Sequence, residues 1–438
     1  IKMPAGEHSV NGWVDLGSED PVVDLKVLTK GIRVEPLAAA IAPDVALTGN
    51  LDNEVTVKGK IPNPEVAGKM NFYEGSFNKY LLDDAVGEYS VTDGSLYLKN
   101  FVIHALQTEI HLDGTVDKNK NLDFVMNASK IELKRLAIPD KVKVSGLVDL
   151  NGKLKGTLAA PLFTGELNSR SIIINDQEFT DITGNLESSG GKVNRLRGSA
   201  RQGGGLFGID MLIDFTDALL QGNVEVKGGN MKSLLLLAGQ DYDIAGDLDG
   251  SIIVNKEGKG TGISVGGQIR NCSIRGISYP SAVFDVFIHK DILNILKVRI
   301  DEVNGGFLAA QGTIDFRNRN LALDAFCSEA DASVLNAFIK APIDFGGKMS
   351  FAAQVGGTIE NPAANASLSV SQGQIADTPF DNLYGMFILR DDLYNIEQLY
   401  VQKDIYKVSA YGAVPQDLFR AKGDRRNPDA QMSIKVKL

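Results

Sequence analysis

The chain has 438 residues, of which 43% are hydrophobic and 23% charged, and this composition excludes a disordered protein. Its formal net charge of -10 argues against nucleic acid as the main partner, because a phosphate-binding surface needs an excess of Lys and Arg. The 46 glycines and 14 prolines favour many strands joined by tight turns.

A four-residue pattern, Gly-x-apolar-Asp, recurs along the chain at intervals of about one hundred residues. It occurs as Gly12 to Asp15, Gly114 to Asp117 and Gly312 to Asp315, with degenerate copies at Met211 to Asp214 and Gly412 to Pro415. A second glycine anchor has the same period and comprises Gly49, Gly146, Gly246 and Gly347. Such self-similarity indicates a repeat architecture. The aspartates of the first pattern (Asp15, Asp117, Asp214 and Asp315) stand at strand ends, where a carboxylate caps a turn or blocks edge pairing.

Strands are indicated by period-two alternation of apolar and polar residues. In chain order, the apolar members that we expect on one face are Val23, Leu25, Val27, Met70, Phe72, Leu122, Phe124, Met126, Val224, Val226, Leu321, Leu323, Leu368, Val370, Met432, Ile434 and Val436. Intervening residues such as Asp123 and Asp324 are expected on the opposite face. Dipeptides such as Asp93-Gly94 supply the left-handed positions that hairpin turns require.

A short helical segment follows the alternating strands about once per repeat. These segments are 35–41, 134–137, 231–238 and 332–340. The sequence therefore predicts units of five or six strands and one short helix. We place the end of a preceding repeat at 1–44, repeat units at 45–142, 143–241 and 242–342, and a final unit, complete or truncated, at 343–438.

The predicted fold class is all-β, as an elongated, curled antiparallel sheet (a β-taco or repeating β-groove). Alternating strands bury one face and leave the other in water. No Pro/Ser-rich or charged tract separates the units, so the sheet is expected to continue from one unit to the next. Eight helical residues per unit cannot cover the apolar face. Either the sheet closes on itself or a ligand fills the trough.

Units of several long strands with the recurring Gly-x-apolar-Asp pattern and a short linking element resemble the TamB family and, more broadly, AsmA-like and repeating-β-groove bridge proteins. The resemblance covers the whole chain and implies a periplasmic segment of an inner-membrane-anchored envelope protein of a diderm bacterium. It further implies that phospholipid acyl chains occupy the apolar groove between the inner and outer membranes. For the parent protein, the resemblance implies an N-terminal membrane anchor, which lies outside this chain. It also implies a contact with an outer-membrane barrel of the BamA/TamA type and a role in outer-membrane protein assembly.

Two other function classes remain open. The apolar residues would equally form the closed core of a structural or adhesive surface repeat, similar to an autotransporter passenger. A catalytic role is disfavoured, because the chain has no HExxH motif, GxSxG motif or complete phosphate-binding loop. We expect no enzyme activity and no cofactor.

Neither the histidines nor the cysteines predict a metal site. His104 and His111 are seven residues apart in strand-like sequence, which would place them on opposite faces. Cys272 and Cys327 fit no zinc or redox motif. Both fall in apolar runs, so buried free thiols are expected, with a single bridge between them as the alternative.

Overall fold

The computed structural model describes residues 6–17, 21–41, 46–77, 80–105, 107–135, 143–157, 159–190, 193–214, 219–257, 260–337, 344–415 and 431–437. The chain divides into two compact units. Unit one comprises residues 1–202 and 208–217, and unit two comprises residues 203–207 and 218–438. This division falls inside the predicted repeat 143–241, so the compact units are not the sequence repeats.

Unit one contains the first twelve strands. They are β1 (Glu7–Asp15), β2 (Val22–Arg33), β3 (Leu47–Lys60), β4 (Glu65–Phe77), β5 (Tyr80–Thr92), β6 (Ser95–Ala105), β7 (Thr108–Val116), β8 (Asn121–Glu132), β9 (Val144–Thr157), β10 (Pro161–Ile174), β11 (Gln177–Ser189) and β12 (Val193–Gln202). Strand β13 (Gly205–Asp214) is shared between the two units.

Unit two contains the remaining strands. They are β14 (Leu219–Asn230), β15 (Ile244–Glu257), β16 (Gly260–Ile274), β17 (Ile277–His289), β18 (Ile292–Asp301), β19 (Phe307–Asp315), β20 (Asn320–Asp331), β21 (Phe345–Gly357), β22 (Pro362–Ile375), β23 (Thr378–Arg390), β24 (Leu393–Lys403), β25 (Tyr406–Pro415) and β26 (Ser433–Lys437).

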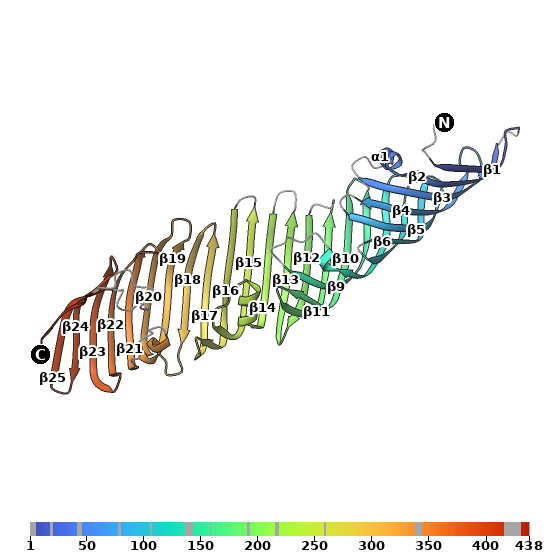
Figure 1. Ribbon diagram of the computed structural model, residues 1–438. Helices are drawn as coiled ribbons and strands as arrows, with labels where there is room; N and C mark the ends of the chain where they lie inside the picture. Colours follow the sequence, from blue (N-terminus) through green and yellow to red (C-terminus); the bar gives the residue numbers. More distant parts are fainter. Residues whose placement is uncertain are drawn as a thin grey trace. The chain divides into compact units, whose positions relative to one another are not determined.

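Within each unit, every strand pairs with the next one in the chain, and the described pairings are antiparallel. Figure 1 shows the strands of each unit side by side in chain order. Among the described pairings, β1 has β2 as its single partner and β26 has β25, so the sheet is not closed. Twelve strands spaced about 4.8 Å apart make the sheet of unit one elongated, with a width on the order of 55 Å. The predicted fold class, an elongated and curled all-β sheet, is confirmed.

Each predicted repeat from 45–142 onward contains six strands. Short helices follow the strands at the four places that the sequence indicated: α1 (Glu35–Ile41), the 3-10 helix η1 (Leu133–Arg135), α2 (Met231–Leu237) and the 3-10 helix η2 (Ala332–Ala337). Residues 136–137 and 338–340, which the prediction included, lie outside the described residues. Helix α2 begins after Asn230, whose side-chain oxygen accepts a hydrogen bond from the backbone N–H of Ser233 at 2.9 Å. None of the described helices has the length and apolarity needed to cross a bilayer.

A β-bulge interrupts one strand of each repeat just before the helix. In β8 the register shifts between Ala128 and Ile131, and Lys130 has a φ of 59°. The backbone N–H of Lys130 is left out of the ladder and donates to Asp149 Oδ1 on β9 at 2.8 Å. The same arrangement recurs as Gly31 with Asp52, Gly228 with Asp249, and Glu329 with Ser350. Because a bulge bends its strand, these sites curl the sheet at the same place in every repeat.

Candidate apolar groove

Cross-strand register assigns the apolar residues to one face of each sheet. Directly opposed residues of an antiparallel pair point to the same side. Phe72 on β4 is opposed by Leu51 on β3 and by Ala85 on β5. We call the face that carries Phe72 the inner face in unit one. The same register in unit two connects Val226, Leu323 and Val370, and we call that face the inner face of unit two.

The groove residues predicted in unit one share this inner face. On β2, the residues Val23, Leu25 and Val27 oppose Gly59, Val57 and Val55 on β3. Val57 and Val55 oppose Val66 and Gly68 on β4, which share a face with Met70 and Phe72. Leu122, Phe124 and Met126 on β8 oppose Val116, Gly114 and Leu112 on β7. The rows continue through β5 and β6, so these eight residues belong to one surface.

The groove residues predicted in unit two also share a face, with one exception. Val224 and Val226 oppose Ile252 and Gly250, and the rows continue across β16–β19 to Leu321 and Leu323 on β20. From there they continue through β21 to Leu368 and Val370 on β22 and reach Ile434 and Val436 on β26. Met432 precedes β26 and lies outside the described pairings, so the register does not assign it to a face.

The inner face is most deeply buried beside the bulges. In unit one, a buried cluster on this face includes Ile32, Leu51, Phe72, Ala85 and Phe101. Comparable buried runs in unit two are Leu248, Ile269 and Ala282, and then Met349, Val370 and Leu383. We call these buried rows the crease. The short helices contact strands that carry these rows or lie beside them: α1 contacts β3, η1 contacts β9, α2 contacts β15 and η2 contacts β21.

Away from the crease, most inner side chains are partly exposed. Leu25, Val27, Met70 and Met126 are partly buried, as are Leu321, Leu323 and Leu368. At the first strand, Val10 and Val14, which oppose Val27 and Val23, are 54% and 44% exposed. Leu122 and Phe124 are exceptions, because each is less than 10% exposed. The apolar inner face is therefore anchored by a buried crease and still accessible along much of its depth.

The amount of exposed surface agrees with an open arrangement. The chain has a solvent-accessible surface of 26633 Å². Two compact globules that each held half of its 47.1 kDa mass would together expose about 20,000 Å². No described strand in either unit is assigned to a second sheet that would cover the first. On β4, the inner residues from Val66 to Phe72 span about 20 Å, which exceeds half the thickness of a bilayer hydrocarbon core (about 15 Å).

A hydrogen-bonded polar pair lies on the inner face of unit one, and Ser188 and Asn194 form another opposed polar pair there. Asn53 on β3 lies in the row of Met70, and Tyr89 on β5 lies in the row of Gly68. The Asn53 Nδ2 atom donates to Tyr89 Oη at 2.9 Å. Burial raises the pKa of Tyr89, so the phenol is neutral at pH 7. The two side chains form hydrogen bonds with each other, which leaves few unpaired donors or acceptors on this part of the inner face.

The outer face carries charges in alternation. Across β2–β5, Lys26 pairs with Glu54 at 2.5 Å and Lys69 pairs with Glu88 at 2.8 Å. Hydrogen bonds from the lysines lower the pKa values of Glu54 and Glu88. Opposite charges on adjacent strands favour the observed register over slipped ones. Across β2–β5 the outer face is therefore charged, whereas the outer face of unit two also carries the exposed side chains of Phe326 and Met386.

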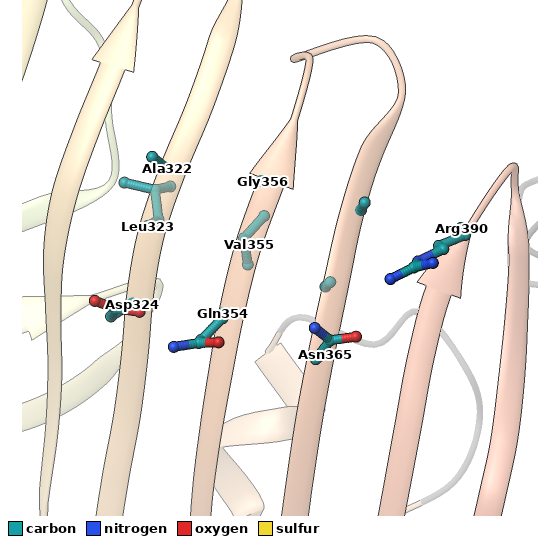
Figure 2. Close-up of a pocket in the computed structure, with 10 residues that line it drawn as sticks. Ala322, Leu323, Asp324, Gln354, Val355, Gly356, Asn365 and Arg390 are labelled. Atoms are coloured by element: carbon teal, nitrogen blue, oxygen red, sulfur yellow. The ribbon is translucent and has the colours of Figure 1, made fainter.

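A shallow depression of about 380 Å³ lies over β20–β23 in unit two. Figure 2 shows its polar side chains, Asp324, Gln354, Asn365 and Arg390, on successive strands. Register places Asp324, Gln354 and Asn365 in one outer-face row. Their mixed charge and amide groups suit water better than hydrocarbon, although Leu323 and Val355 also line the depression.

The expected orientation of His104 and His111 was wrong. A turn at residue 107 places His104 on β6 and His111 on β7, so both lie on the outer face beside Glu109. His104 Nδ1 lies 2.5 Å from Asp84 Oδ1, and this hydrogen bond is the main cause of a raised pKa for His104. Within the part of the chain that the structure describes, no group of three His, Cys, Asp or Glu residues is arranged to hold a metal ion.

The cysteines and the repeated aspartates have structural roles. Cys272 and Cys327 are buried and free, as expected, and burial raises the pKa of Cys327 to about 11. Asp15, Asp117 and Asp315 each accept backbone N–H groups from the turn that follows them, which confirms the predicted turn capping.

The alternating apolar rows were predicted from the sequence, whereas the β-bulges that bend the strands were not. The bulge acceptors Asp52, Asp149 and Asp249 recur with the repeat period, and that recurrence was the available signal. No protein-family model matches the chain, and no curated protein or solved structure matches it.

Proposed function

We propose that this chain is a non-catalytic lipid-transfer segment whose inner face shields the acyl chains of phospholipids from water. The observation that carries the proposal is the continuous apolar inner face, which spans every described strand pairing of each unit and remains partly exposed. A soluble protein that leaves such an area uncovered gains stability when an apolar ligand covers it.

The energetics favour a trough for this task. Exposure of a lipid tail to water costs about 0.8 kcal/mol per CH₂, so two long acyl chains cost more than roughly 20 kcal/mol. A trough lined by many similar aliphatic side chains removes most of this cost without a single tight site. Such uniform binding permits movement along the sheet, because each step exchanges equivalent contacts.

The cellular setting belongs to the same proposal. The strand pattern that resembles the TamB and AsmA-like families supports a periplasmic location and transfer between the inner and outer membranes. A barrel partner and a role in outer-membrane protein assembly would be properties of the parent protein. A structural or adhesive role is the alternative, and it would leave the inner face without lipid.

Native mass spectrometry of the purified chain tests the proposal. We expect adducts with the masses of diacyl phospholipids, and we expect fewer of them per chain when Leu323 is replaced by Asp. A wild-type chain that carries no lipid, before and after incubation with phospholipid vesicles, would contradict the proposal.

A further inference from the structure

Two turns at the edge of the groove carry basic residues in the same order. The β7–β8 turn reads Asp117-Lys118-Asn119-Lys120-Asn121, and the β19–β20 turn reads Asp315-Phe316-Arg317-Asn318-Arg319-Asn320. One turn lies in unit one and the other in unit two. We call them the basic turns.

Each basic turn is built around its own aspartate. Asp117 Oδ1 accepts the backbone N–H groups of Asn119 and Asn121 at 2.8 Å, and Asp117 Oδ2 accepts Asn121 Nδ2 at 2.8 Å. Asp315 accepts the backbone N–H groups of Arg317 and Asn318, and its Oδ2 accepts Asn318 Nδ2 at 2.7 Å. Hydrogen bonds from Asn121 and Asn318 lower the pKa values of the two aspartates. The carboxylates are thus occupied within the turns, while the basic side chains are exposed.

The basic turns stand where the apolar inner face ends. Val116 and Leu122 form the last inner pair before the first basic turn, and Ile314 and Leu321 form the last inner pair before the second. An amphiphile whose tails contact Leu122 or Leu321 would hold its polar end beside the basic residues. The corresponding turn after Asp15 contains no basic residue, so the basic turns are not a general property of the repeat.

We infer that the basic turns bind the anionic phosphate of a lipid headgroup, and that the groove prefers phosphate-bearing lipids over neutral lipids with the same tails. This inference rests on the proposed function. Lysine and arginine form charge-assisted hydrogen bonds with phosphate oxygens, and arginine does so with two parallel donors. In unit two, Glu360 already pairs with Arg319, so Arg317 provides the stronger contact there.

The test compares two fluorescent lipids with identical acyl chains, phosphatidylglycerol and diacylglycerol, on the full chain. Wild-type protein should bind phosphatidylglycerol roughly fivefold to tenfold more tightly, as expected for two exposed charge-assisted contacts. In the variant K118Q/K120Q/R317Q/R319Q this preference should fall below about twofold, with diacylglycerol binding unchanged.

The matched control removes the same number of lysines and arginines at the opposite ends of the strands. The variant K130Q/K134Q/R201Q/R275Q should keep the wild-type preference. If neither lipid binds the wild type, the proposed function itself fails. If both bind but the preference is absent, or survives in the basic-turn variant, only this inference is overturned. Binding of inorganic phosphate to the wild type, lost in the basic-turn variant, together with no preference between the two lipids would assign the basic turns to the free anion and would also overturn it.

Discussion

The ring of Phe124 on β8 lies against Gly114, its direct partner on β7. A Cβ atom at Gly114 would come within 2.7 Å of the Phe124 ring and 2.2 Å of the Asp123 carbonyl oxygen. Gly114 is a member of the recurring Gly-x-apolar-Asp pattern, and Gly12, Gly312 and Gly412 meet a neighbouring carbonyl oxygen in the same way. The recurring glycine is therefore required by the close approach of the next strand on the inner face.

Replacement of Gly114 by Ala should destabilise the protein by roughly 1–3 kcal/mol, because the added methyl group forces the backbone and the Phe124 ring apart. Urea unfolding monitored by circular dichroism measures this change. The control is Gly266→Ala, where a Cβ would find its nearest atom at 3.7 Å and should change stability by less than about 0.5 kcal/mol. Equal effects at both positions would refute the packing explanation.

Replacement of Asp149 by Ala should destabilise the protein by about 1–3 kcal/mol, because the bulge N–H of Lys130 loses its charged acceptor. The bulge then has no side chain to hold it. Hydrogen exchange at the Lys130 amide reports this directly and should accelerate in the variant. Asp123→Ala, on the same outer surface and without such a bond among the described contacts, serves as the control. Unchanged exchange at Lys130 would show that the bulge does not depend on Asp149.

The ion pair of His104 with Asp84 predicts a pH-dependent contribution to stability. The pKa of His104 is raised above its ordinary value of 6.5 in the folded state, chiefly by the hydrogen bond to Asp84. Folding therefore favours the protonated form, and the contribution is fully present below pH 6.5 and is lost as pH rises through the folded pKa. Because both side chains are 40% exposed, solvent screening keeps it below about 1 kcal/mol.

The stability difference between wild type and His104→Gln should thus be larger at pH 5.5 than at pH 8.5. Thermal unfolding at the two pH values measures it, and His111→Gln provides a comparison on the neighbouring strand. A difference that grows with pH would contradict the assigned role of Asp84.

Local sequence pattern was sufficient for the strands and their inner face, because side-chain alternation depends only on backbone geometry. The bulges were not predictable in this way, since the Lys130–Asp149 bond depends on the register between strands. The prediction for the two histidines failed for a related reason. A turn at residue 107 was not recognised, and it places His104 and His111 on neighbouring strands and not seven residues apart on one strand. The sequence also did not predict which inner residues are buried. Phe124 is buried and lies against Gly114 on another strand, whereas Met126, two residues away, is partly exposed.

That difference in burial changes which inner residues suit functional tests. A charge at Phe124 would disrupt packing, whereas Leu323 is partly exposed. Leu323→Asp should retain the circular dichroism spectrum of the wild type and should lower its phospholipid content by the share that binds near β20. Asp324→Asn, one residue along the strand on the outer face, should retain it. Lipid loss in both variants, or in neither, would contradict an inner-face site.

The central claim is that hydrocarbon occupies the inner face and not the outer one. Photo-crosslinking residues placed in turn at Met126, Leu323 and Ile434, and at their outer-face neighbours Asp123 and Asp324, test it within cells. We predict that the three inner positions capture phospholipid and that the two outer positions do not. Equal capture on both faces, or capture at none of the inner positions, would contradict the account.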